Sequence, residues 1–155
     1  MSTPHDPALH LIPAPGGGVG AAGDGVTGGV TAAWVARVSL GPPRVAVSVA
    51  PERFTHGLID ASGFFTLSIL KPDQVDVGRL FGLRSRRDVD KWAETAHVLL
   101  EGEAPALERC AARISCRVVD RLTTGDHELF VGEILGSETV DGGPALPMRG
   151  KDWAP

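Results

Sequence analysis

The stretch that decides the fold is "VTAAWVARVSLGPPRVAVSVAPERFTHGLIDASGFFTLSIL", residues 30–70. Apolar side chains alternate with small or polar ones over residues 30–40 and again over 44–50, and "GPP" separates the two runs. This period of two predicts two strands joined by a turn. Residues 55–62 have the apolar spacing of a short helix that ends at Gly63, and the apolar run after it predicts a third strand.

Toward the C-terminus the sequence predicts two helices and then a hairpin. The helices are expected over residues 73–83 and over 89–100, where apolar residues recur at intervals of three and four. Residues 112–122 and 127–140 alternate as strands, and "TTGD" between them is a hairpin turn. Because the order lacks the regular β-α-β alternation of a parallel sheet, it favours a mainly β antiparallel barrel with flanking helices.

The N-terminal part of the chain contains "GVGAAG", residues 18–23, which has the spacing of a dinucleotide-binding turn. That motif requires a buried strand before it, a helix after it and an acidic residue about 20 positions further on. Prolines interrupt the preceding apolar run, further glycines follow, and no Asp or Glu lies between Asp24 and Glu52. The sequence therefore predicts a Gly-rich edge segment instead, with its turn at "GDG".

This composition also suggests how the chain is divided. We expect residues 1–25 to form a partly ordered Gly/Pro-rich segment, and residues 26–155 to form one barrel domain.

Charge and apolar content exclude several classes of function. A net charge of −4 provides no basic surface for a phosphate backbone, so nucleic-acid binding is not expected. The apolar runs are too short to span a bilayer, and the N-terminus lacks the pattern of a signal peptide. Cys110 and Cys116 are expected to be reduced and buried, with a disulfide or redox pair as the alternative. These features indicate a cytoplasmic protein that binds neither membranes nor nucleic acid.

Three places in the sequence are candidates for chemistry. At "PERFTH", Arg53 and a helix beginning at Thr55 are able to bind an anion, although a helix cap and a solvated arginine fit the same pattern. His127 lies where a turn leads into an apolar strand, a position suited to a cavity and equally to the surface. Lys91, in "SRRDVDKW", borders the apolar face of the expected second helix. Such a charge run is normally a solvated helix start.

Taken together, residues 30–70, "FGLRSRRDVDKW" and "GDHELFVGEI" resemble the flavin reductase-like, FMN-binding split-barrel family, which includes flavoredoxins. The likeness covers about residues 26–153, and the motifs occur in the order of the family. It implies a Greek-key-like split β-barrel and a homodimer with flavin near the subunit interface. It also implies hydride transfer from NADH or NADPH to FMN, with FAD as the alternative flavin, and a monooxygenase or another electron acceptor as partner.

The resemblance also assigns roles to individual residues. It places Thr31, Ala32, Ala33 and Trp34 along the isoalloxazine ring, and Arg53, Thr55 and Lys91 at the flavin phosphate. It places His127 beside the ring, where the nicotinamide docks, and Trp153 over the flavin of the partner subunit.

Three departures from the family pattern leave other functions open. Gly28 occupies a position where Asn is frequent, Arg86 stands where glycine is usual, and the first strand is glycine-rich. An FMN reductase is the leading hypothesis. The alternatives are an FMN-binding electron carrier without a nicotinamide site, and a barrel that has lost its flavin.

Overall fold

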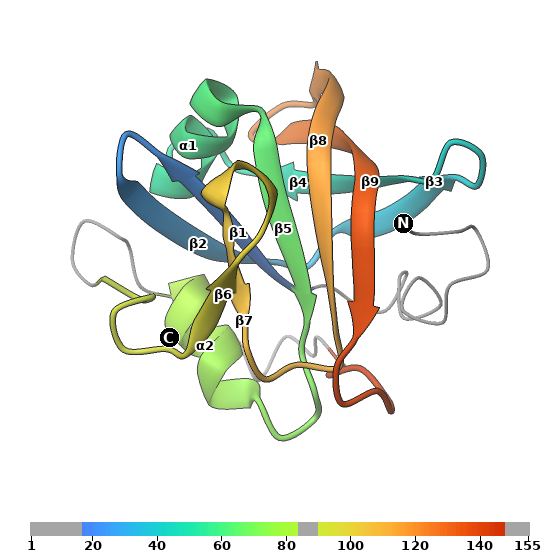
Figure 1. Cartoon of the computed structure of the whole chain (residues 1–155). Helices are drawn as coiled ribbons and strands as arrows, with labels where there is room; N and C mark the ends of the chain where they lie inside the picture. Colours follow the sequence, from blue (N-terminus) through green and yellow to red (C-terminus); the bar gives the residue numbers. More distant parts are fainter. Residues whose placement is uncertain (1–16, 84–89, 148–155) are drawn as a thin grey trace.

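The computed structural model describes residues 17–83 and 90–147, and these form a rolled seven-stranded sheet, a separate two-stranded sheet and short helices on the outside (Figure 1). In chain order the elements are β1 (Gly17–Gly23), β2 (Val26–Ala32), β3 (Val35–Ser39), β4 (Arg44–Val49), α1 (Phe54–Ser62), β5 (Phe64–Ile69), α2 (Val75–Leu83), β6 (His97–Leu99), a 3₁₀ turn (Glu101–Glu103), β7 (Pro105–Leu107), β8 (Ala112–Thr123) and β9 (Glu128–Thr139).

The strand order explains why the sheet must close into a barrel. Seven strands pair antiparallel in the order β2-β1-β5-β8-β9-β4-β3, so β2 and β3 lie at opposite edges. Only Ala33 and Trp34 separate these two strands along the chain. Because the three Cα–Cα steps from Ala32 to Val35 span about 11 Å at most, the end of β2 and the start of β3 must lie close together, and the sheet must curve. The predicted fold class, a mainly β split barrel with flanking helices, is confirmed.

The glycine-rich N-terminal run is a strand of the barrel. β1 pairs with β2 on one side and with β5 on the other, so the edge strand is β2, and our expectation of a Gly-rich edge segment at residues 17–23 is corrected. Asp24 and Gly25 form the predicted turn, both with positive φ, as a two-residue hairpin requires. The boundary that we expected between residues 25 and 26 falls inside this hairpin.

Close approach of the β6–β7 pair explains why a glycine stands at position 20 of β1. A Cβ on Gly20 would collide with the backbone carbonyl of Pro105 in β7 and would lie 2.7 Å from Oγ1 of Thr66. A β-branched residue at Gly20 would therefore push the β6–β7 pair off the sheet.

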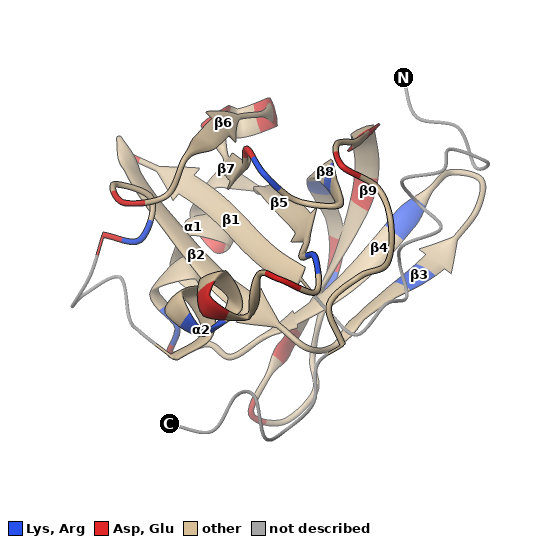
Figure 2. Cartoon of the chain, turned by 90° about the horizontal axis from the view of Figure 1, so that it is seen from below, with Lys and Arg blue, Asp and Glu red and all other residues tan. Residues whose placement is uncertain are grey.

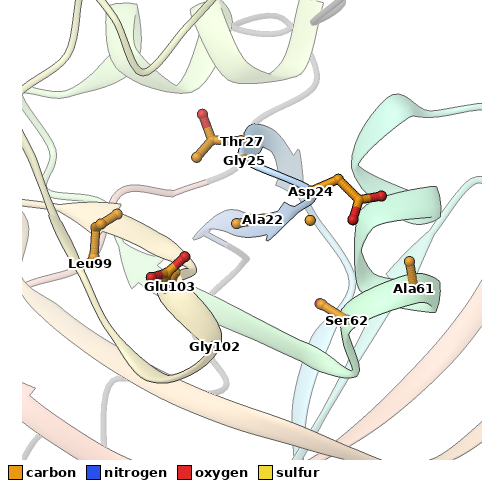
Figure 3. A pocket seen from close by; sticks show the side chains of 10 residues that line it. Ala22, Asp24, Gly25, Thr27, Ala61, Ser62, Leu99, Gly102 and Glu103 are labelled. Atoms are coloured by element: carbon orange, nitrogen blue, oxygen red, sulfur yellow. The ribbon is translucent and has the colours of Figure 1, made fainter.

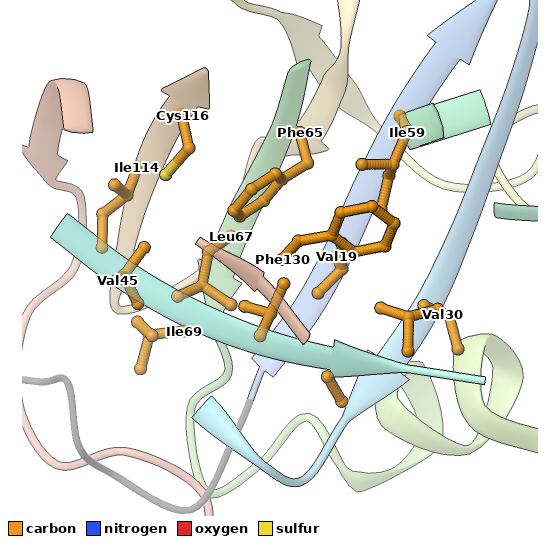
Figure 4. Packing of buried hydrophobic residues seen from close by; sticks show 14 of the residues in the cluster. Val19, Val30, Val45, Ile59, Phe65, Leu67, Ile69, Ile114, Cys116 and Phe130 are labelled. Carbon is orange, nitrogen blue, oxygen red and sulfur yellow. The ribbon is translucent and has the colours of Figure 1, made fainter. Parts of the chain in front are cut away.

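The core lies between the inner faces of the barrel strands (Figure 4). Each of the long strands contributes alternate apolar side chains, as the period of two predicted. The largest are Phe65 and Phe130, which are fully buried. The other residues labelled in Figure 4 are Val19, Val30, Val45, Ile59, Leu67, Ile69, Ile114 and Cys116.

The first helix begins slightly earlier than predicted. Arg53 is the N-cap of α1, without a side-chain cap hydrogen bond, and Thr55 lies inside the first turn. Gly63, with φ of 78°, ends the helix as expected. The apolar side of α1 covers β1 and β2 through Leu58 and Ile59.

The amphipathic helix expected over residues 89–100 is wrong for the residues described there. Residues 91–95 form turns, and His97–Leu99 is β6, which pairs with β7. The apolar spacing does not mark the buried face of a helix. Trp92 is buried on its own, where it packs against Phe81 and donates its indole N–H to the carbonyl of Gly28. Lys91 is therefore not on a helix.

Charge and thiols follow the sequence-based expectations where the structure describes them. Acidic and basic segments are interspersed along the ribbon when it is viewed from below (Figure 2). Cys110 and Cys116 are free and buried. None of the described helices is long and apolar enough to cross a membrane.

Candidate functional site

A cavity of about 320 Å³ opens at the seam where β2 passes into β3. Its walls come from the end of β2, the link to β3, the end of β4, the segment before α1, the end of α2 and the β8–β9 turn. The lining residues are Val30, Thr31, Ala32, Ala33, Trp34, Ser48, Val49, Ala50, Glu52, Arg53, Gly82 and His127.

Six of the nine predicted site residues line this one cavity: Thr31, Ala32, Ala33, Trp34, Arg53 and His127. They come from three segments that are far apart in the sequence, so their meeting depends on closure of the barrel. Thr55 and Lys91 are not among the lining residues. Trp153 lies outside the described residues, as does Arg86.

Trp34 and His127 form one rim of the cavity. Their rings meet edge to face, with centroids 4.9 Å apart. The indole of Trp34 is 64% exposed, which is unusual for a residue of this size in a monomeric domain. Nδ1 of His127 lies 2.9 Å from a carboxylate oxygen of Asp126. When Nδ1 carries the proton for this hydrogen bond, Nε2 is the ring nitrogen left for a ligand.

The opposite side of the cavity carries positive charge. Arg53 donates from Nη2 to the carbonyls of Phe81 and Gly82, at 3.2 and 3.3 Å. Behind it, the ammonium of Lys91 donates to the carbonyls of Gly29 and Phe81, each at 2.8 Å. Burial, with a smaller contribution from the charge of Arg53, lowers the pKa of Lys91 to about 8. Among the described residues neither cation forms a salt bridge with a carboxylate, but Glu52, which also lines the cavity, attracts Arg53 and partly offsets the lowering of the Arg53 pKa by burial.

Two predicted contact residues direct their side chains into the protein. The hydroxyl of Thr31 donates to the carbonyl of Gly78 at 2.7 Å, so Thr31 ties β2 to α2. Thr55 is 2% exposed, and its Oγ1 faces Gly28, where an added Cβ would lie only 3.1 Å away. An added Cβ on Gly28 would also lie 2.9 Å from Leu58. A glycine at this position therefore lets α1 pack directly on β2.

The predicted site residues do not include Ser48, Ala50 and Glu52, which also line the cavity. The signal was present in the small residues that alternate with valine along β4, because small side chains next to a turn leave room for a ligand. Nothing in the local pattern indicated that the end of β4 would face the β8–β9 turn.

A second hollow, of about 410 Å³, lies at the other end of β1 and β2 (Figure 3). It is lined by the β1–β2 turn, the end of α1 and the 3₁₀ turn, with the carboxylates of Asp24 and Glu103 on its walls. None of the predicted site residues lines it, so the seam cavity is the candidate functional site.

Known proteins resemble this chain in sequence and in structure. A protein of Aeropyrum pernix described as uncharacterized is 35% identical over 134 residues, and the chain spans 49% of its length. The reductase component of a 4-nitrophenol 4-monooxygenase/4-nitrocatechol 2-monooxygenase from Rhodococcus opacus is 35% identical over 133 residues, which is 86% of this chain and 70% of that protein.

Two solved structures share the fold. An FMN-binding protein from Thermus thermophilus superposes with a TM-score of 0.78 at 32% identity, over 83% of this chain and 72% of that one. An NADH:FAD oxidoreductase from Streptomyces globisporus, solved with NAD and FAD fragments, gives a TM-score of 0.73 at 29% identity, over 81% and 74% of the two chains.

The sequence model of the flavin reductase like domain matches residues 9–151, nearly the whole chain. With the split barrel and its seam cavity, this match shows that the chain belongs to the flavin reductase-like family.

Proposed function

We propose that the protein is an NAD(P)H-dependent flavin reductase that moves a hydride from a nicotinamide to FMN held in the seam cavity. The observation that carries the proposal is the convergence of Thr31 to Trp34, Arg53 and His127 on one cavity. The similarity to a monooxygenase reductase component and to an NADH:FAD oxidoreductase supports the same chemistry.

The charged side of the cavity fits the phosphate of FMN. Arg53 lines the cavity and the buried Lys91 lies behind it, and Lys91 has no bonded carboxylate among the described residues, so its charge is costly without an anion nearby. The first turn of α1 has neither a side-chain cap nor an acidic residue, so its dipole adds to the positive field. An anion bound at this side of the cavity would offset the cost of the buried charge and would be attracted by the positive end of the α1 dipole.

The aromatic side of the cavity fits the flavin ring. Trp34 and the small residues Ala32 and Ala33 leave room in the cavity for the isoalloxazine, and FMN when bound would supply the hydride acceptor. The chain has to orient the two rings and exclude water. When both ring nitrogens carry protons, His127 donates Nδ1–H to Asp126 and has Nε2–H available to stabilise negative charge on the reduced ring.

The proposal includes a homodimer that covers the open side of the cavity. Large apolar side chains remain exposed at the rim of the site and further along β3 and the turn after it, including Trp34, Val38 and Leu40. A partner subunit packed there would shield the flavin. We also propose a cytoplasmic location, because both cysteines are free thiols, and a monooxygenase or another electron acceptor as the consumer of reduced flavin.

An FMN titration followed by anaerobic NADH or NADPH tests the function. We expect quenched flavin fluorescence on binding and then bleaching of the visible flavin band. Arg53→Gln should weaken binding of FMN more than binding of riboflavin, which lacks the phosphate. Arg109→Gln is the matched control, because Arg109 is a surface arginine paired with Asp73 away from the cavity.

Each other result has a defined meaning. Binding without bleaching by either nucleotide would replace the reductase with an FMN-binding electron carrier. Absence of binding would reject a flavin site altogether.

A further inference from the structure

A network of charged side chains joins α1 to the turn end of the β8–β9 hairpin. Nε2 of His56 lies 2.6 Å from Oε1 of Glu128. Arg121 donates to both oxygens of the same carboxylate, at 3.1 and 3.2 Å, and its Nη1 lies 2.6 Å from Asp60. The ring of Phe130 lies under this group, 5.1 Å from the His56 ring and 5.1 Å from the Arg121 guanidinium.

Glu128 is the centre of the network. Its side chain is only 14% exposed and receives hydrogen bonds from two different elements, α1 and β8. Hydrogen bonds from Arg121 and then from His56 hold the pKa of the Glu128 carboxyl below its ordinary value. The carboxylate is therefore ionised at neutral pH.

The network lies directly beside the candidate site. Glu128 is the first residue of β9 and follows His127 in the chain. On the other side of His127, the backbone N–H and the hydroxyl of Thr124 both donate to the His127 carbonyl at 3.0 Å. His56 lies in the first turn of α1, three residues after Arg53. The network thus spans both sides of the seam cavity.

We infer that Glu128 is a positioning residue that fixes the imidazole of His127 against Trp34 by clamping the start of β9 to α1. Its oxygens hold the strand on one side of His127 while Thr124 holds the turn on the other. Without the Glu128 carboxylate, His56 and Arg121 lose their shared acceptor, and the start of β9 is held only by backbone pairing with Val49 and Thr123 and by the internal hydrogen bonds of the turn. The consequence for hydride transfer rests on the proposed function, whereas the consequence for the ring contact does not.

A matched control is present in the same hairpin. Arg117 and Glu133 form a comparable ion pair between β8 and β9, 2.8 Å long, and Glu133 is not a lining residue of the cavity. Glu133→Ala removes one carboxylate from the same two strands. It therefore reports the general cost of losing such a pair.

Nuclear magnetic resonance of the ligand-free full chain tests the positioning directly. We expect cross-relaxation between the Trp34 and His127 rings in the wild type and in Glu133→Ala, and its loss in Glu128→Ala. If Glu128→Ala keeps this contact, the inference is overturned. If that variant does not fold, Glu128→Gln takes its place. The Gln amide has only one oxygen, so its NH₂ group faces His56 or Arg121, which both donate to Glu128 in the wild type. An unchanged ring contact in Glu128→Gln would equally overturn the inference.

Single-turnover kinetics measure the effect on chemistry. With FMN bound, Glu128→Ala should slow hydride transfer by about tenfold or more while FMN affinity stays within about twofold, since small misplacements of a reacting group are costly. Equal rates in the Glu128→Ala and Glu133→Ala variants would contradict a positioning role. If the wild type itself transfers no hydride, the proposed function fails, and the ring contact alone decides the inference.

Discussion

Arg53 and Lys91 donate hydrogen bonds to one acceptor, the carbonyl oxygen of Phe81, at 3.2 and 2.8 Å. Two cations thus meet at the end of α2, where the helix dipole is negative. This dipole and the carbonyls hold both charges in place without a salt bridge to a carboxylate of the described residues. The arrangement makes the ammonium of Lys91 sensitive to any anion that enters the cavity.

FMN affinity should therefore depend on pH through Lys91. The pKa of Lys91 is lowered to about 8, mainly by burial, and a bound phosphate raises it. Between the free and the bound pKa, the complex keeps a proton that the free protein has lost, so affinity falls with rising pH by up to about tenfold per unit. Fluorescence titrations from about pH 7 to about pH 9 measure this slope.

Two controls isolate the contribution of Lys91. Lys91→Arg keeps its charge at high pH and should remove the slope, and riboflavin, which has no phosphate, should not show it. A slope that persists in Lys91→Arg would assign the titration to another group.

Gly28→Ala should destabilise the protein by about 1–3 kcal/mol, because the new methyl group must displace α1 from β2. The closest atom that it would meet is a methyl carbon of Leu58, at 2.9 Å. Gly57→Ala is the matched control, since Gly57 lies inside the same helix with nothing within 4 Å, and it should stabilise by about 0.5–1 kcal/mol. Urea unfolding of both variants gives the comparison. Equal effects would show that α1 is free to shift.

His127→Gln should lower the rate of flavin reduction by about tenfold or more and leave FMN affinity nearly unchanged, because His127 is proposed to act on the ring and not on the phosphate. Stopped-flow bleaching of bound FMN measures the rate, and a fluorescence titration measures the affinity. A loss of affinity that accounts for the whole effect would make His127 a binding residue instead.

Neither cysteine should react with a thiol reagent in the folded protein. Burial raises the pKa of the Cys110 thiol to about 11 and raises the pKa of Cys116 as well. Ellman's reagent should detect no thiol under native conditions and two per chain in urea. Rapid labelling of the native protein would show that the core opens around β8.

Some of the barrel strands were predictable from their apolar pattern. The period of two in residues 44–50 corresponds to β4, the apolar run of residues 64–70 corresponds to β5, and "TTGD" is the turn between β8 and β9. The strand expected over residues 30–40 is divided between β2 and β3. The neighbour relations of β1 were not predictable. They depend on pairing with β5, about 45 residues away, and a glycine run carries no apolar pattern that would set its partner.

The candidate site, like the fold, was predictable only in part. Its residue types were found from motifs and resemblance, but the side-chain directions were not. Thr55 turns toward β2 because Gly28 makes space for it, and Lys91 is drawn inward by two carbonyls. Both effects depend on residues distant in sequence, so a local pattern cannot reveal them.

The two-residue link between β2 and β3 also has a consequence for folding. Ala33 and Trp34 join the two outermost strands, so the seam closes only after the β1–β2 and β3–β4 hairpins have both found their places. Such a late, long-range closure is a weak point at which a barrel opens first. A flavin bound across this seam would contact both edge strands and so stabilise the closed form of the barrel. Amide hydrogen exchange along β2 and β3 should then slow more on FMN binding than exchange along β8.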